Sequence, residues 1–121
     1  MPDGQPILLV EDDADSRHML ATVLELTGRT VVTACNGREA FTIATERRPS
    51  LILLDLMMPV MTGEEFRKAQ LASDELRPIP VVILSAHHDA PAIAKRLKAA
   101  ACLRKPVDFD DLGRIVERYA R

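Results

Sequence analysis

Short apolar runs alternate along the chain with stretches that carry helical periodicity. Two of the runs, Leu51–Leu54 and Val81–Leu84, are continuously apolar, as expected of strands covered by helices on both faces. Three more runs of strand length complete the predicted set: Ile7–Val10, Val31–Ala34 and Ala101–Leu103. The pattern therefore predicts five strands with helices between them.

The intervening stretches place apolar residues three and four positions apart, which is the spacing of one helix face. The predicted helices run from Ser16 to Leu26 with a stop at Gly28, from a cap at Asn36 to before Pro49, from about Thr62, from Ala90 to Lys98, and from a cap at Asp108 to Arg121. The inward face of the first helix should consist of Met19, Leu20, Val23 and Leu24. Five β-α units imply a parallel sheet with right-handed crossovers. We therefore predict a doubly wound (βα)5 α/β sandwich in which residues 1–121 form one domain.

Composition narrows the class of protein. The chain has 121 residues, of which 47% are hydrophobic and 28% charged, and its formal net charge of −2 gives no electrostatic footprint for nucleic acid or an anionic membrane. The N-terminus lacks the basic region of a signal peptide, and no apolar run is long enough to span a bilayer. The two cysteines, Cys35 and Cys102, are expected to be buried thiols in a reducing compartment. We expect a cytoplasmic protein that binds neither nucleic acid directly nor a membrane.

Polar residues follow the predicted strands at their carboxyl ends, where open α/β sheets bind their ligands. They are Glu11, Asp12 and Asp13 after the first strand, Asp55 after the third, Ser85 after the fourth and Lys105 after the fifth. Clustered carboxylates repel one another unless a cation lies among them, and hard oxygen ligands suit Mg²⁺. The sequence therefore predicts a magnesium site at this edge of the sheet.

Each of these residues also has a purely structural interpretation. Asp13 or Asp15 can cap the following helix, Ser85 can close its own loop, and Lys105 with Pro106 can form a turn. Asp55 is different, because it interrupts an apolar run and an unpaired charge there is costly. Polar groups of this kind at four matching strand ends favour a functional site over coincidence.

Four segments resemble the response-regulator receiver domains of two-component signalling systems. They are Ile7–Asp13, Leu53–Gly63 with its Asp-Leu-Met-Met-Pro motif, Val82–Ala86, and Leu103–Pro106. The segments occur in the family's order and at its spacing over essentially the whole chain. This resemblance implies a flavodoxin-like sheet of strand order 2-1-3-4-5.

The resemblance also implies a role for each site residue. Asp55 would accept a phosphoryl group from a phosphohistidine of a histidine kinase or a histidine phosphotransfer protein. Asp12, Asp55 and the backbone carbonyl of Met57 would bind Mg²⁺, and Glu11 would act through a metal-bound water. Ser85 and Lys105 would contact phosphoryl oxygens. The Lys105–Pro106 bond would be cis. Such a domain is no enzyme beyond its own phosphorylation and dephosphorylation, and it signals to a downstream protein by contact or phosphorelay.

Four positions bear on how this chain compares with the rest of the family. Cys102 stands where the family often has an aromatic ring that moves together with Ser85 as a switch. Met57 and His87 would flank the path of the water that hydrolyses the phosphoryl group, and the thioether of Met57 is a poor partner for a water. Thr62 replaces a frequent Asp and should still cap its helix.

Other functions remain open at this point. A flavodoxin-like cofactor binder would need a phosphate-binding loop after the first strand, where Glu11 and Asp12 would repel a phosphate. A phosphatase or dehalogenase with an Asp nucleophile generally has a second acid at position 57, which is Met. A third alternative is a phosphorylation-independent interaction domain on a receiver scaffold. The pair His87 and His88 suggests a second metal site, although a solvated loop is the simpler interpretation.

Overall fold

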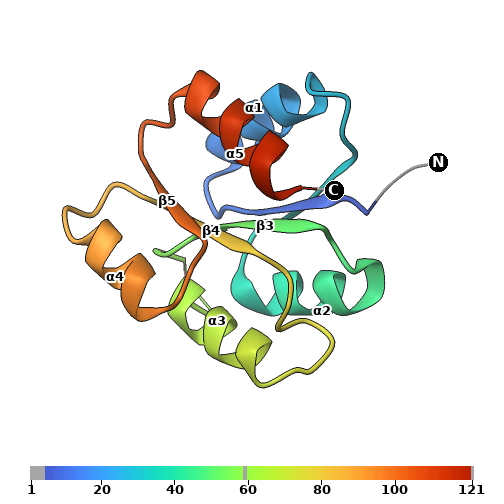
Figure 1. The fold of residues 1–121 in the computed structure, drawn as a ribbon, viewed down its shortest axis with the longest axis vertical. Helices are drawn as coiled ribbons and strands as arrows, with labels where there is room; N and C mark the ends of the chain where they lie inside the picture. Colours follow the sequence, from blue (N-terminus) through green and yellow to red (C-terminus); the bar gives the residue numbers. More distant parts are fainter. Residues whose placement is uncertain (1–4, 59, 121) are drawn as a thin grey trace.

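Strands and helices alternate without exception along the chain. The computed structural model describes residues 5–58 and 60–120 (Figure 1). Its elements are β1 (Ile7–Val10), α1 (Ala14–Glu25), β2 (Val31–Ala34), α2 (Gly37–Arg47), β3 (Leu51–Asp55), α3 (Gly63–Leu71), β4 (Val81–Ser85), α4 (Ala90–Arg96), β5 (Ala101–Arg104) and α5 (Phe109–Tyr119). The strands form one parallel sheet of order β2-β1-β3-β4-β5. The predicted fold class and strand order are confirmed.

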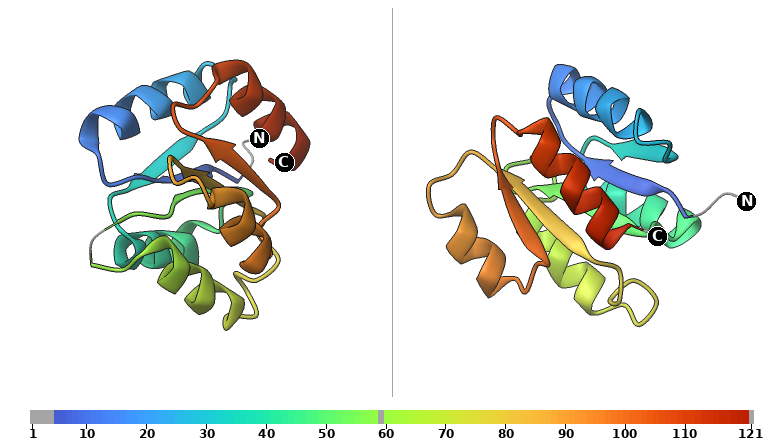
Figure 2. Two further views of the ribbon diagram at one scale, coloured as in Figure 1. Left: turned by 90° about the vertical axis from the view of Figure 1, so that its left-hand side faces the viewer. Right: turned by 45° about the horizontal axis from the view of Figure 1, so that its top comes forward.

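Helices cover both faces of the sheet, with α1 and α5 on one side and α2, α3 and α4 on the other (Figures 1 and 2). Successive residues of a strand point to opposite faces, so each strand contributes to two separate cores. On β1, Ile7 and Leu9 pack toward α1 and α5, whereas Leu8 and Val10 pack toward the other three helices. This arrangement explains why the central strands are continuously apolar.

Side-chain caps fix the beginning of four helices. Asp13, Asn36, Thr62 and Asp108 each accept a hydrogen bond from a backbone N–H in the first turn of α1, α2, α3 and α5. Thr62 forms a full capping box with Glu65. The predicted caps at Asn36, Thr62 and Asp108 are confirmed. Asp13, rather than Asp15, caps the first helix.

Several predicted boundaries need correction. The β3, β4 and β5 strands each extend one residue further than predicted, because Asp55 pairs with Leu84 and Ser85 with Arg104 in the parallel ladder. The helix α1 begins at Ala14, before Ser16. The helix α4 ends at Arg96, because Lys98 adopts a left-handed backbone with φ of 59°. Pro59 of the Asp-Leu-Met-Met-Pro motif and Arg121, the predicted end of the last helix, lie outside the described residues.

The predicted inward face of α1 is partly wrong. Leu20 and Leu24 are buried, but Met19 is 49% exposed. Val23 packs against the same core from a partly buried position, whereas Met19 lies at the edge of the apolar face and is turned to solvent. Cys35 and Cys102 are free thiols, as predicted, although both are half-buried rather than buried. No helix in the described part of the chain is long and apolar enough to cross a membrane.

Phe66 is the key packing residue beneath the sheet. Its side chain is fully buried and meets the edge of Phe41 at a ring-centroid distance of 6.5 Å. We predict that Phe66→Ala lowers the free energy of unfolding by about 3–5 kcal/mol, because truncation leaves a cavity in a rigid core. Leu26→Ala is the control: this side chain is 82% exposed, and its loss should change stability by less than about 0.5 kcal/mol. Urea denaturation of both variants measures the difference, and similar losses would contradict the prediction.

Candidate functional site

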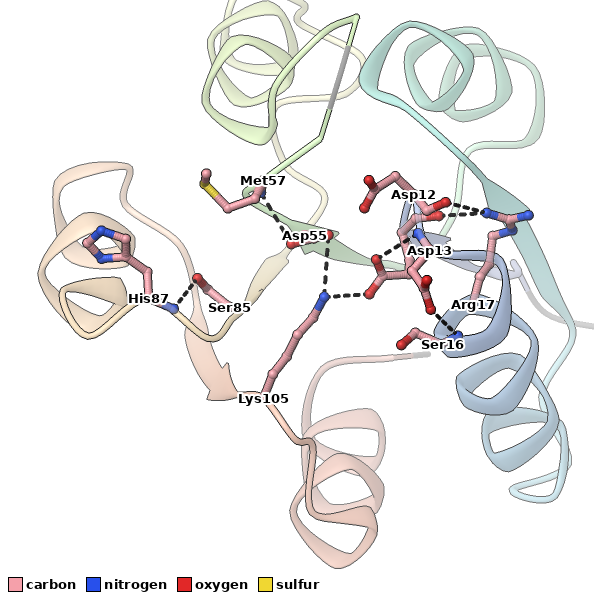
Figure 3. Close-up of polar contacts among 10 residues, drawn as sticks. Asp12, Asp13, Ser16, Arg17, Asp55, Met57, Ser85, His87 and Lys105 are labelled. Atoms are coloured by element: carbon pink, nitrogen blue, oxygen red, sulfur yellow. Dashed lines mark hydrogen bonds and ion pairs between the residues drawn. The ribbon is translucent and has the colours of Figure 1, made fainter.

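The predicted polar residues gather at the carboxyl edge of the sheet (Figure 3). Asp55 and Ser85 are the last residues of β3 and β4, Glu11 follows β1, and Lys105 follows β5. Parallel strands point the same way, so their carboxyl ends share one edge. Residues separated by up to 94 positions in the chain therefore come into contact there.

Lys105 joins two buried carboxylates. Its Nζ lies 2.6 Å from Oε1 of Glu11 and 3.4 Å from Oδ2 of Asp55. Glu11 is only 1% exposed and Asp55 only 3%. Buried charges are stable only when they are paired, and this ammonium pairs with both. The lysine and the two acids form the floor of the site.

A third acid completes a cluster that can hold a metal ion. One carboxylate oxygen from each of Glu11, Asp12 and Asp55 lies within 4.8 Å of the others. Asp12 is exposed, so the cluster is open to solvent on its side. Three carboxylates outnumber the single ammonium, and hard oxygens are the donors that divalent cations such as Mg²⁺ and Ca²⁺ prefer. The donor set fits a hard divalent cation.

The pKa values of the two buried acids, Glu11 and Asp55, also favour binding of a cation. Burial and the neighbouring Glu11 together raise the pKa of Asp55 to about 7. Burial also disfavours ionised Glu11, but its hydrogen bonds with Lys105 and Asp55 outweigh burial and lower the pKa of Glu11. Without a cation, the negative charge therefore concentrates on Glu11, and Asp55 retains a proton to nearly neutral pH. A bound cation would favour the ionised form of Asp55.

The loop after β1 is held in place by side chains from α1. Asp13 accepts from the N–H of Ser16 at 2.8 Å, and its own N–H donates to Oε2 of Glu11 at 3.2 Å. Nη1 of Arg17 donates to the carbonyls of Glu11 at 2.9 Å and Asp12 at 3.3 Å (Figure 3). The sequence did not lead us to predict this role for Arg17. Its position one helical turn after the capping Asp13 was the signal that could have indicated a contact with the preceding loop.

Ser85 lies at the opposite side of the site. Its side chain is buried, and its Oγ accepts a hydrogen bond of 3.0 Å from the N–H of His87. The hydroxyl keeps its own hydrogen for a ligand, because an accepting oxygen can still donate. The N–H of Lys105 donates to the carbonyl of Ser85 at 3.0 Å, and the Lys105–Pro106 bond is cis, as predicted.

Met57 and His87 stand at the rim of the site. Both line a hollow of ≈ 450 Å³ together with the acids and Lys105. Met57 is 69% exposed, and its N–H donates to Oδ1 of Asp55 at 3.2 Å. The ring of His87 points away from Asp55 (Figure 3). The structure therefore brings Met57 and His87 to the mouth of the site and leaves their predicted influence on hydrolysis as a prediction.

Two other predicted residues lie outside this constellation. Cys102 pairs with Ile83 in the sheet and packs against the core under α2, α3 and α4, where burial raises the pKa of its thiol. His87 and His88 stack with ring centroids 4.7 Å apart, and a metal could approach them with Asp89. However, Nδ1 of His87 already accepts from the N–H of Asp89 at 3.0 Å, and all three residues are exposed. The solvated-loop interpretation is favoured.

Gly63 allows the helix α3 to begin against the backbone of Asp55. A Cβ atom at this position would lie 2.6 Å from the carbonyl oxygen of Asp55 and 2.9 Å from Cα of Leu56. The N–H of Gly63 also donates to the carbonyl of Leu56 at 3.2 Å. Any larger residue would therefore displace the strand end that carries Asp55.

Comparison with known proteins identifies the family. The family model of the response regulator receiver domain matches residues 7–117. The chain belongs to this family. Receiver domains work in phosphorylation-based two-component signalling, and the match is to this family rather than to a flavodoxin-like cofactor binder or a hydrolase with an Asp nucleophile.

Individual relatives agree with the assignment. The chain is 35% identical to sporulation initiation phosphotransferase F of Bacillus subtilis, covering 96% of this chain and 94% of that protein. It is 36% identical to the polar-differentiation response regulator DivK of Brucella anthropi, with 93% and 94% covered. The regulatory protein AtoC of Escherichia coli is 34% identical, but the receiver spans only 24% of it. The structure of the chemotaxis protein CheY4 of Vibrio cholerae matches with a TM-score of 0.88 at 31% identity, covering 97% and 99% of the two chains.

The raised pKa of Asp55 gives this receiver a pH-dependent stability. Between the ordinary pKa of 3.8 and about 7, the folded protein binds a proton that the unfolded chain has lost. Stability therefore falls as pH rises through this window. We predict that Asp55→Asn, which removes the charge, raises the free energy of unfolding at pH 8 in chelator by roughly 1–2 kcal/mol, after allowance for screening.

Chemical denaturation at pH 8 and pH 4 checks this prediction. The advantage of Asp55→Asn should be smaller at pH 4, where Asp55 of the folded wild-type protein is protonated. Addition of Mg²⁺ at pH 8 should stabilise the wild-type protein more than the variant. An equal advantage at both pH values would contradict the electrostatic explanation.

Proposed function

We propose that this receiver accepts one phosphoryl group on Asp55, with Mg²⁺, from a phosphohistidine of a histidine kinase or a histidine phosphotransfer protein. The main support is the position of Asp55 at the end of β3, beside a lysine and two further acids. Phosphoryl transfer depends chiefly on positioning and on neutralising the charge of the phosphoryl oxygens. Both requirements are met by groups on neighbouring strand ends.

The metal would be held by Asp12, Asp55 and the backbone carbonyl of Met57, with Glu11 acting through a water. When bound, Mg²⁺ would neutralise the carboxylates and the phosphoryl oxygens. The exposed position of Asp12 leaves the cluster open on the side from which a hydrated cation can enter. Small divalent cations usually keep several waters, which fits an open cluster of this kind.

The chain's own residues carry out the transfer. A carboxylate oxygen of Asp55 attacks phosphorus, a P–O bond forms, and the P–N bond to the donor imidazole breaks. Lys105 pairs with one phosphoryl oxygen, and Ser85 donates its hydroxyl hydrogen to another. Ser85 ends β4, the strand next to β3, and Lys105 follows β5, the strand beyond β4, so both groups approach Asp55 from the same side of β3.

The surface beside the site suits a protein donor. A hollow of ≈ 250 Å³ adjoins Lys105 and is lined by the side chains of α1 and of the β5–α5 connection. Two of its large apolar residues, Met19 and Phe109, are 49% and 47% exposed. Exposed apolar side chains next to a reactive group indicate contact with another protein. The donor histidine would approach over this surface.

The output would depend on Ser85 rather than on an aromatic residue. Cys102 has no ring to move, and its half-buried thiol fills space in the core. A phosphoryl group would draw the hydroxyl of Ser85 away from the N–H of His87 and so displace the loop 86–89. The alternative of a phosphorylation-independent interaction domain would leave this loop unchanged, so hydrogen exchange across residues 86–98 with and without beryllofluoride distinguishes the two.

Labelling tests the acceptor directly. With Mg²⁺ and acetyl phosphate, the purified chain should gain one acid-labile phosphoryl group, visible by intact-protein mass spectrometry. Asp55→Asn should remove the label because an amide is a poor nucleophile. Asp12→Asn, which keeps Asp55 but weakens the cation cluster, should lower the rate. Undiminished labelling of Asp55→Asn would overturn the acceptor assignment, and labelling that survives chelation would overturn the role of Mg²⁺.

The lifetime of the phosphoryl group tests the rim residues. Met57 cannot orient a water, since a thioether is at best a weak acceptor. We expect slow loss of phosphate in the wild-type protein and a several-fold faster loss in Met57→Asn. Met57→Leu, which keeps the apolar character, serves as the matched control and should decay as the wild type does. An unchanged or slower decay in Met57→Asn would count against this role.

A further inference from the structure

Two polar side chains are buried in α3, remote from the carboxylate cluster. Arg67 is 5% exposed and Gln70 is fully buried. Arginine is almost never buried unless it is paired. Among the residues that the structure describes, no carboxylate forms an ion pair with Arg67, and all buried side-chain polar atoms have a hydrogen-bond partner. Its hydrogen-bond partners are therefore neutral groups.

Arg67 holds the end of the neighbouring helix α4. Its Nε donates to the carbonyl of Leu97 at 2.9 Å, and its Nη2 donates to the carbonyl of Lys98 at 2.8 Å. Leu97 is the cap of α4, and Lys98 follows with a left-handed backbone. The last carbonyls of a helix lack partners within it and carry partial negative charge. The guanidinium satisfies two of these carbonyls at once.

The same arginine is braced within α3. Its Nη1 donates to Oε1 of Gln70 at 2.7 Å, and Nε2 of Gln70 donates to the carbonyls of Leu76 at 2.9 Å and Ile79 at 3.0 Å. The network thus links α3, the segment leading to β4, and the end of α4. On the surface, Arg96 of α4 contacts both carboxylate oxygens of Glu64 in α3 at 3.0 and 3.2 Å.

The other end of α4 is held weakly. Asp89, at its N-terminus, makes no side-chain capping bond, and residues 86–89 are all exposed. The N–H of Ala90 reaches only the carbonyl of His87, at 3.1 Å. This loosely held end directly follows Ser85. The helix α4 is therefore held by side-chain hydrogen bonds at its far end, whereas its end near the site, where Ala90 is buried, has no side-chain cap.

We infer that α4 is hinged on Arg67, so that a change at Ser85 swings its N-terminal turn while its C-terminal end stays in place. Beside it, α3 lies on the same face of the sheet (Figures 1 and 2). A groove of ≈ 400 Å³ between the two is lined by Met57, Thr62, Glu64, Lys68, His87 and Ile93, among others. Such a swing changes the width of this groove. The groove is therefore the surface that differs between the phosphorylated and the unphosphorylated protein. The link to Ser85 rests on the proposed function, whereas the hinge itself does not.

Hydrogen exchange in the free protein tests the hinge alone. The amides of Leu97 and Ala99, bonded to Ile93 and Ala94, should exchange at least about tenfold more slowly than the amide of Ala90. Arg67→Met should abolish this difference. Lys68→Met is the control, because Lys68 is exposed and the substitution also removes one positive charge, and it should preserve the difference. Should Arg67→Met fail to fold, Arg67→Lys replaces it, since an ammonium cannot donate to Leu97, Gln70 and Lys98 in the geometry of the guanidinium. A difference that is absent in wild type or unaffected by the Arg67 variant overturns the inference.

Exchange with Mg²⁺ and beryllofluoride tests the coupling to the site. In wild type the change should be confined to residues 86–93, and in the Arg67 variant it should extend to residues 94–99. Ser85→Ala should suppress it. Equal changes in both halves of wild-type α4 overturn the hinge. If fluorine NMR detects no bound beryllofluoride, the proposed function fails, and the free-protein measurement still decides the hinge.

Discussion

The contact of Lys105 with Glu11 and Asp55 is the constraint around which the site is built. Two ionised carboxylates removed from water repel each other, and one ammonium between them reduces that repulsion. Even with Lys105, the cluster including Asp12 carries an excess of negative charge. That excess works against the stability of the free protein, and it is also what attracts a cation. A binding site of this kind is therefore maintained at some expense to the fold.

Much of this arrangement could be predicted from sequence because it follows from local rules. Runs of apolar residues locate strands, and the caps Asn36, Thr62 and Asp108 mark helix starts by their own chemistry. The direction of parallel strands then places Asp55 and Ser85 at the same edge without any knowledge of loops. The chemistry of the site was predictable once the topology was.

The contributions of the arginines were not predictable in this way. Arg17 and Arg67 bind backbone carbonyls of other segments, and a carbonyl leaves no mark in the sequence. A long polar side chain on a helix is normally read as solvated, so the burial of Arg67 and Gln70 contradicts the usual pattern. Met19 failed for a related reason: periodicity identifies a face of α1 but not where the sheet stops covering it.

The site divides into a buried floor and an exposed rim, with consequences for how the protein can evolve. Asp55, Glu11 and Ser85 are buried, so their replacement disturbs both charge balance and packing. Met57 and His87 project from loops into solvent, where substitutions cost little stability. Under the proposed function, substitutions at these two rim positions would change how long the phosphoryl group persists while leaving the buried floor intact. The duration of a response could then diverge between related proteins whose transfer chemistry is the same.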